Sequence, residues 1–112
     1  MNAQDQERFR ALIAAQLAAL EAEDALGQGG QAVVTLDQQA VGRLSRMDAL
    51  QSQAMARAGQ ARRDARKRAL QAAVGRLVDG DFGYCDDCGE EIALKRLEFD
   101  PSVVRCISCA SG

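Results

Sequence analysis

Hydrophobic residues in the first part of the chain recur every three or four positions. They are Phe9, Leu12, Ile13, Leu17 and Leu20. This spacing places all five on one face of an α-helix, so we predict a helix over about residues 4–26. The glycine-rich residues 27–30 predict its end, because glycine readily adopts the left-handed conformation found at helix C-termini. We therefore expect a turn over residues 27–36.

A second helix is predicted to start at the sequence Thr35-Leu36-Asp37-Gln38. Thr35 fits the N-cap of a capping box, with Gln38 three residues later. Asp37 then falls in the first turn, where the helix dipole favours a negative charge. No helix-breaking sequence follows until Asp79-Gly80, so this helix is predicted over about residues 36–78.

Mostly small or apolar residues of the second helix follow alternating steps of four and three, which is typical of a heptad seam. These residues are Ala40, Leu44, Met47, Gln51, Ala54, Ala58, Ala61 and Ala65. The predicted fold is mainly α: an antiparallel helical hairpin, or coiled coil, over residues 1–78, followed by a small module over residues 79–112. The first helix is the shorter one and is expected to cover only the first half of the second. Leu70, Val74 and Leu77 lie on another face and are expected to pack against the module.

All four cysteines fall in residues 79–112 as two C-x-x-C pairs. They are Cys85, Cys88, Cys106 and Cys109, with 17 residues between the pairs. Four thiolates at this spacing predict one tetrahedral Zn²⁺ site. A closed site of this kind is structural, because no coordination position remains for water or substrate. The alternatives are an electron-carrying iron site of the rubredoxin kind, which usually has Pro or Gly beside the second pair, and a redox-active C-x-x-C.

The composition excludes several classes of protein. There is no histidine, which removes Ser-His-Asp catalysis and every histidine-containing metal site, and we expect no enzyme activity. Hydrophobic residues make up 47% of the chain, but 21 residues are alanine and only 4% are aromatic, so a large layered core is not expected. No long apolar run predicts a membrane span, and the polar N-terminus does not resemble a signal peptide. The expected location is the reducing cytoplasm, where two disulfides would not persist.

Charge is segregated along the chain. Residues 1–36 hold 5 acidic and 2 basic residues, residues 37–78 hold 3 and 9, and residues 79–112 hold 8 and 3. The densest basic block consists of Arg62, Arg63, Arg66, Lys67 and Arg68. It is expected on the part of the second helix that the first leaves uncovered. The block can be a solvated helix face, a surface for an acidic protein, or a surface that binds nucleic-acid phosphates.

Residues 81–89, Asp-Phe-Gly-Tyr-Cys-Asp-Asp-Cys-Gly, resemble the start of the zinc finger of the DksA/TraR family. The family's pattern continues without a gap at Ile92, Arg96, Pro101, Cys106 and Cys109. The resemblance covers roughly residues 79–109. The hairpin before it is similar to the family in its pattern only.

The resemblance implies a bacterial transcription regulator that binds RNA polymerase, with no direct binding to DNA. Family members insert the helical hairpin into the secondary channel, the pore that admits nucleotides, and its acidic tip approaches the active site. Their zinc module orients the hairpin and contacts the rim of the channel. Some members act with the alarmone ppGpp, which adds ppGpp at the protein–polymerase interface to the expected ligands.

The tip departs from the family's pattern. Well-studied members carry D-x-x-D-x-A where this chain has Asp37-Gln38-Gln39-Ala40-Val41-Gly42, so Ala40 replaces the second Asp. The residues assigned to a polymerase-facing tip are Asp37, Gln38, Arg43 and Arg46. In the alternative interpretation Asp37 only stabilises the helix start, and the arginines are ordinary exposed residues. The N-terminal globular part and the C-terminal helix of longer members are not expected here, which suggests a short variant.

Overall fold

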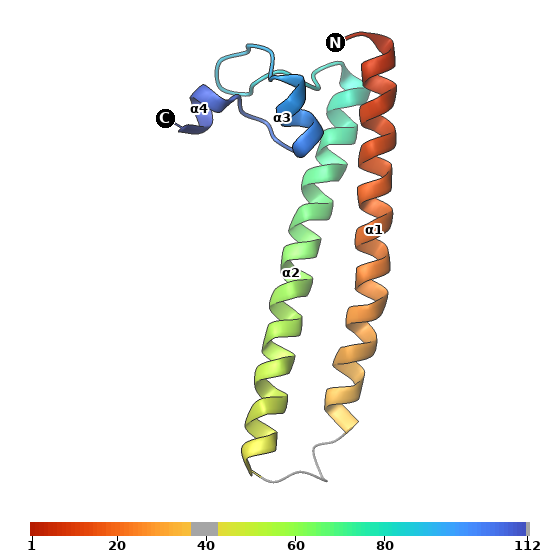
Figure 1. Ribbon diagram of the computed structural model, residues 1–112, viewed down its shortest axis with the longest axis vertical. Helices are drawn as coiled ribbons and strands as arrows, with labels where there is room; N and C mark the ends of the chain where they lie inside the picture. The colour runs from red at the N-terminus through yellow and green to blue at the C-terminus, as the bar shows by residue number, and fades with distance from the viewer. Residues whose placement is uncertain (37–42, 112) are drawn as a thin grey trace. The chain divides into compact units, whose positions relative to one another are not determined.

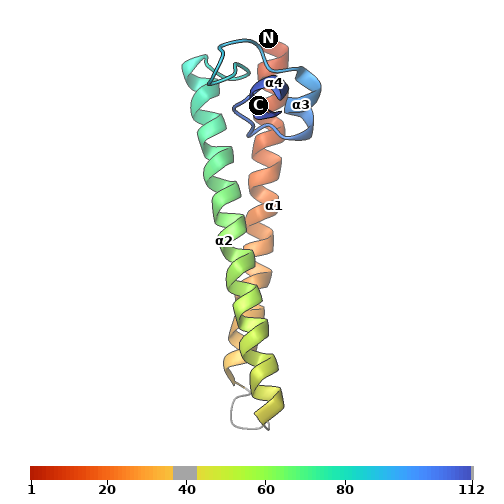
Figure 2. The ribbon, with the colours of Figure 1, turned by 90° about the vertical axis from the view of Figure 1, so that its left-hand side faces the viewer.

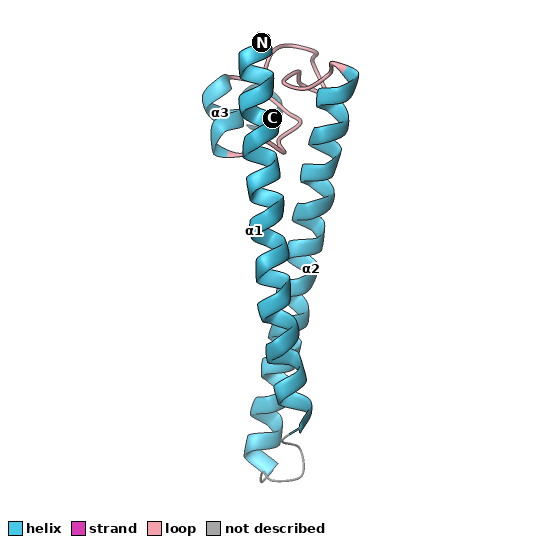
Figure 3. Cartoon of the chain, turned by 90° about the vertical axis from the view of Figure 1, so that its right-hand side faces the viewer, coloured by secondary structure: helices cyan, strands magenta, loops and turns pink. Residues whose placement is uncertain are grey.

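The fold is mainly helical, as predicted. The computed structural model describes residues 1–36 and 43–111, with side chains described for residues 1–26 and 46–111. The helices are α1 (Ala3–Leu36), α2 (Arg43–Asp79), α3 (Leu94–Phe99) and α4 (Ile107–Ser111) (Figure 1). Within the described residues there is no strand, and loops join the short helices (Figure 3). None of the described helices is long and apolar enough to cross a membrane.

The chain divides into two compact units. The first unit, called here the base, consists of residues 1–17 and 68–112. The second unit, called here the arm, consists of residues 18–67. Each unit contains a segment of α1 and a segment of α2, and within each the two segments run in opposite directions (Figures 1 and 2). These units group residues by spatial contact, so the base contains two separate stretches of the chain. They do not test the boundary predicted from the sequence at residue 78, which stays a prediction.

The base contains a hydrophobic core. Its buried hydrophobic residues are Phe9, Ile13, Leu70, Ala73, Leu77, Phe82, Cys85, Ile92 and Leu97. The rings of Phe9 and Phe82 meet with centroids 5.4 Å apart and planes tilted by 50°. This geometry is favourable for an aromatic pair. The core therefore joins the start of α1 and the end of α2 to the residues around the cysteines. The cysteine-containing module is thus stabilised by hydrophobic packing as well as by its cysteines.

The start of α1 and the end of α2 both have recognisable local causes. The side chain of Asn2 accepts a hydrogen bond of 2.7 Å from the backbone N–H of Asp5, which caps the first turn of α1. At the other end, Gly80 has a φ of 83°, and the N–H of Asp81 donates to the carbonyl of Arg76 at 2.9 Å. This is the Schellman arrangement, which requires a left-handed residue just after the helix. The sequence Asp79-Gly80 was thus a correct stop signal.

The predicted turn over residues 27–36 is wrong, because α1 continues to Leu36. Three glycines weaken this stretch by about 1 kcal/mol each, but no proline interrupts it and the backbone can remain helical. Thr35 therefore lies inside α1 and is not the N-cap of α2, which begins at Arg43. The two helices have nearly equal lengths, 34 and 37 residues, where the sequence suggested a short and a long one.

The predicted heptad seam of α2 is also wrong. From Met47 onward its members are exposed, whereas the α2 residues that are half-buried or buried follow another phase. That phase consists of Ala49, Gln53, Ala56, Gln60, Arg63, Lys67, Leu70, Val74 and Leu77. Large side chains bury much more area than alanine, so the leucines near the end of α2 decide which face is covered. On α1 the predicted face is confirmed: Phe9 and Ile13 are buried, and Leu12, Leu17 and Leu20 are half-buried.

Candidate functional site

The first pair of cysteines lies on a tight turn. The N–H of Cys85 donates to the carbonyl of Glu90 at 2.8 Å, and the N–H of Gly89 donates to the carbonyl of Cys85 at 2.9 Å. Gly89 has a φ of 75°, a conformation that glycine adopts without strain. The turn therefore presents Cys85 and Cys88 from one short loop, with Cys85 buried and Cys88 exposed.

The second pair lies at the start of α4. The N–H of Asp86 donates to the carbonyl of Val104 at 2.8 Å, which ties the first turn to the segment before Cys106. Arg105 adds an ion pair of 3.2 Å to Asp87, and its carbonyl accepts from Nε of Arg96 at 3.0 Å. These bonds join α3 and both cysteine turns into one small module.

The four cysteine side chains converge at one point. The Sγ atoms of Cys85, Cys88, Cys106 and Cys109 all lie within 4.8 Å of one another, and those of Cys88 and Cys106 are 3.7 Å apart. A tetrahedral zinc with Zn–S bonds of about 2.3 Å requires sulfur atoms separated by about 3.8 Å. The observed cluster is therefore the right size for one Zn²⁺ ion. The same donor set leaves no open position, which fits a structural metal.

Crowding of the thiols changes their acidity. Backbone hydrogen bonds from Cys106 and Cys88 lower the pKa of the Cys85 thiol to about 6. Hydrogen bonding with the thiols of Cys106, Cys85 and Cys88 raises the pKa of Cys109 to about 12. One thiolate forms easily, whereas the last thiol keeps its proton beside the others. A cation is what allows all four to be thiolates together, so metal binding should release protons.

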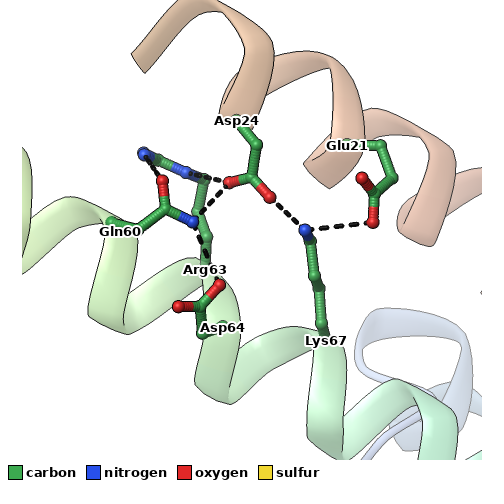
Figure 4. Close-up of polar contacts among 6 residues, drawn as sticks. All are labelled: Glu21, Asp24, Gln60, Arg63, Asp64 and Lys67. Atoms are coloured by element: carbon green, nitrogen blue, oxygen red, sulfur yellow. Dashed lines mark hydrogen bonds and ion pairs between the residues drawn. The ribbon is translucent and has the colours of Figure 1, made fainter. Parts of the chain in front are cut away.

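A second group of polar residues lies in the arm, between α1 and α2 (Figure 4). Oδ1 of Asp24 accepts hydrogen bonds from Nε of Arg63 at 2.8 Å and from Nε2 of Gln60 at 2.9 Å. Oδ2 of Asp24 accepts from Nζ of Lys67, which also forms a 3.0 Å ion pair with Glu21. Gln60 in turn donates to Asp64 at 3.0 Å. Arg63 and Lys67 thus both bond the carboxylate of Asp24, and Gln60 bonds both Asp24 and Asp64.

This arrangement corrects the interpretation of the basic block. The sequence suggested that α1 leaves the block uncovered, but Arg63 and Lys67 bond Asp24 of α1. Because α1 is longer than predicted and antiparallel to α2 in the arm, its acidic residues reach this part of α2. Arg62 and Arg68 are exposed, and Arg66 is half-buried. The exposed basic surface of this block is therefore smaller than the sequence suggests, because Arg63 and Lys67 are paired with Asp24.

The pKa of Asp24 gives a testable prediction. Hydrogen bonds from Lys67 and Arg63 lower it from 3.8 to about 2. A carboxylate with a lowered folded-state pKa stabilises the fold above its unfolded pKa, and this stabilisation is lost as the pH falls through the folded value. We expect Asp24→Asn to reduce the free energy of unfolding by a constant amount above about pH 5, and the difference from wild type to shrink between about pH 4 and 2.

The measurement is urea unfolding of both proteins across this pH range, because the comparison cancels protonation of groups that they share. Glu21 and Asp64 also face the cluster and are present in both. A difference that stays constant down to pH 2 would contradict the charge assignment of Asp24.

The residues assigned to the hairpin tip are only partly visible. Asp37 and Gln38 lie outside the described residues, as does the side chain of Arg43, whose backbone begins α2. Arg46 is exposed on α2. Their role at a tip stays a prediction.

Comparison with known proteins identifies the module. Residues 80–112 match the family described as prokaryotic dksA/traR C4-type zinc finger. The match begins at Gly80, the glycine that ends α2, and includes all four converging cysteines. Residues 80–112 are therefore similar to a dksA/traR C4-type zinc finger. The family and the thiol cluster together fit one structural zinc ion and favour zinc over the iron and redox alternatives.

Curated relatives of this chain are similar to it over a short region. The RNA polymerase-binding transcription factor DksA of Haemophilus influenzae is 50% identical over 40 residues, which are 36% of this chain and 28% of that protein. The protein of the same name from Escherichia coli (strain K12) is 42% identical over 40 residues, which are 36% of this chain and 26% of that protein. The match thus spans little more than a quarter of either relative.

The fold is shared much more widely than the sequence. Transcription factor DksA2 from Pseudomonas aeruginosa has a structure that matches 98% of this chain and 83% of its own, with a TM-score of 0.82. The sequences are 23% identical, so this likeness concerns the fold. It extends over the helices, where sequence similarity to the family was a matter of pattern only.

The cluster around Asp24 was not predicted from the sequence. Acidic residues on an alanine-rich helix are usually solvated, and nothing local distinguishes Asp24 from Glu23. The spacing of residues along α2 nevertheless gave an indication of this cluster. Lys67 lies three residues before Leu70, and Arg63 lies four residues before Lys67, so both share the covered face of α2 with Leu70. A cation on a covered face needs an acidic partner.

Proposed function

We propose that this chain is an RNA polymerase-binding transcription regulator and not an enzyme. The observation that carries the proposal is the C4-type zinc finger at residues 80–112, with its four cysteine Sγ atoms within 4.8 Å of one another. The names of the relatives from Haemophilus influenzae and Escherichia coli support it, because both are RNA polymerase-binding transcription factors. A closed Cys₄ site also argues for a structural metal without catalysis.

In the finer proposal, the helical hairpin enters the secondary channel of the polymerase, and Asp37 and Gln38 are directed toward the active site. Arg43 and Arg46 follow at the start of α2 and would contact the channel wall. The zinc module holds the hairpin in position, with ppGpp as a candidate ligand at the protein–polymerase interface. The shared fold with DksA2 supports a hairpin of the required kind, and a cytoplasmic location is part of the same proposal.

Equilibrium binding to purified core RNA polymerase tests the proposal. We expect a dissociation constant of about 1 μM or tighter, and displacement by another protein that occupies the secondary channel. Binding without competition would place the contact on another surface of the polymerase and would reject the channel. Absence of binding at this concentration would reject the polymerase as partner.

A matched pair of variants tests the tip separately. Asp37→Ala removes the acidic residue proposed to face the active site, and Asp48→Ala removes an exposed acidic residue further along α2. We expect the Asp37 variant alone to lose its effect on transcription from a promoter that responds to the wild-type protein. Equal activity of the two variants would mean that Asp37 has no role in regulation.

Nucleic-acid binding remains the competing function, carried by the exposed Arg62 and Arg68. It requires affinity for DNA that falls steeply as salt is raised, by about one logarithmic unit per phosphate contact. Pairing of Arg63 and Lys67 with Asp24 weakens this candidate, because two of the five cations in the block already have carboxylate partners.

A further inference from the structure

Buried side chains are distributed unequally between the two units. Every buried hydrophobic residue among the described side chains belongs to the base. In the arm, where side chains are described for residues 18–26 and 46–67, one residue is buried, and it is Asp24, at 8% exposure. Burial of hydrophobic side chains therefore stabilises the base, whereas the residue buried in the described part of the arm is a carboxylate.

The residues that bond Asp24 lie on the covered face of α2. Gln60, Arg63 and Lys67 continue, at steps of three and four, the phase of the buried Leu70 and Leu77. In the base these positions hold leucine or valine, and those opposite Asp24 hold polar or charged side chains. Preceding seam positions of the described arm are Ala56, Gln53 and Ala49, which offer little apolar area.

The side chains of the ion pairs are mostly covered, but they remain accessible enough for dissolved salt to weaken their attraction. The side chains of Arg63 and Lys67 are 19% and 16% exposed, and that of Asp24 is 11% exposed. Pairs at this depth attract more strongly than surface pairs but still weaken as salt is added. Without Asp24, Arg63 would lose its ion pair with α1, and Lys67 would keep its ion pair with Glu21.

We propose that Asp24, Arg63 and Lys67 form an ionic latch that holds residues 18–26 of the arm against residues 60–67, and that these two helix segments separate locally when the latch is weakened while the base stays folded. Local opening is expected where few apolar contacts oppose it, and no hydrophobic side chain described in residues 18–26 and 46–67 is buried. Salt should favour opening, because it screens the latch without weakening the hydrophobic core of the base. The ionic latch thus makes the separation of the two helix segments of the arm sensitive to ionic strength. The proposal does not depend on the function of the chain.

Hydrogen exchange on the full zinc-loaded chain tests the ionic latch. We expect Asp24→Asn to speed exchange in peptides from residues 18–26 and 50–67 by about tenfold, with less than about a twofold change in peptides from residues 70–77. Glu23→Gln is the matched control, since it removes the same charge from the neighbouring exposed position. Zinc content, measured on each variant, checks that the base is intact.

A second experiment varies the salt concentration. Raising NaCl from about 0.05 M to about 0.5 M should speed exchange of the wild-type arm several-fold. The combined variant Asp24→Leu, Arg63→Leu, Lys67→Leu should exchange more slowly and lose this salt dependence, because an apolar layer replaces the charges. Unchanged exchange in Asp24→Asn, equal acceleration in arm and base, or the same salt dependence in the triple variant would each overturn the proposal.

Discussion

Replacing Cys85 by serine should abolish zinc binding and unfold residues 82–110. Cys85 is the most buried of the four cysteines, and its backbone N–H is part of the turn that presents Cys88. In zinc-finger peptides, metal binding contributes on the order of 10 kcal/mol or more, so loss of one thiolate ligand outweighs the few buried side chains of the module. We expect zinc to fall from one ion per chain to below about 0.1, and amide protons of the module to exchange as in an unfolded chain.

Asp86→Ser is the control for this variant. It introduces the same residue at the next position, where the side chain is exposed and only the backbone N–H is bonded, to Val104. The control should keep its zinc and its protection. A Cys85→Ser protein that retains stoichiometric zinc and a protected module would contradict the structural role of the metal.

The second large effect is expected for Phe9→Ala. Phe9 is fully buried in the base, with its ring against Phe82 and the guanidinium of Arg8 4.9 Å from its ring centroid. Truncating a buried phenylalanine removes its transfer free energy and leaves a cavity, which together cost about 3–5 kcal/mol. We expect a decrease of this size in the free energy of unfolding, measured by urea denaturation followed by far-UV circular dichroism.

Phe99→Ala makes the same chemical change at a residue that is 90% exposed. It should alter the free energy of unfolding by less than about 0.5 kcal/mol. Comparable losses in the two variants would mean that the aromatic contact between α1 and the module does not stabilise the base.

The zinc site was largely predictable from the sequence. Two C-x-x-C pairs, a glycine after Cys88 and the spacing to Cys106 encode a site whose geometry is set by short turns within 25 residues. The metal imposes the remaining order, so little depends on distant parts of the chain. The hydrogen bond from Asp86 to Val104 and the ion pair from Arg105 to Asp87 could not be predicted, because they arise only when the two turns meet.

The long helices were predictable in kind but not in their ends or faces. The end of α2 at Asp79-Gly80 was correct because glycine there satisfies a local backbone requirement. The glycines at residues 27–30 resembled a similar stop, yet α1 passes through them to Leu36. Helix propensity differs by only about 1 kcal/mol per glycine, and such a difference is easily outweighed by the rest of a helix.

By itself, the sequence determined the helical class, the apolar face of α1 and the set of four cysteines, because each follows from contacts or periodicity within a short stretch of chain. Only the tertiary structure decided which face of α2 is covered and that Arg63 and Lys67 meet Asp24. Alanine is compatible with either phase of the seam, since it buries too little area to select one. The choice was made by the large side chains in the base, and the charged residues of the arm then follow in the same register.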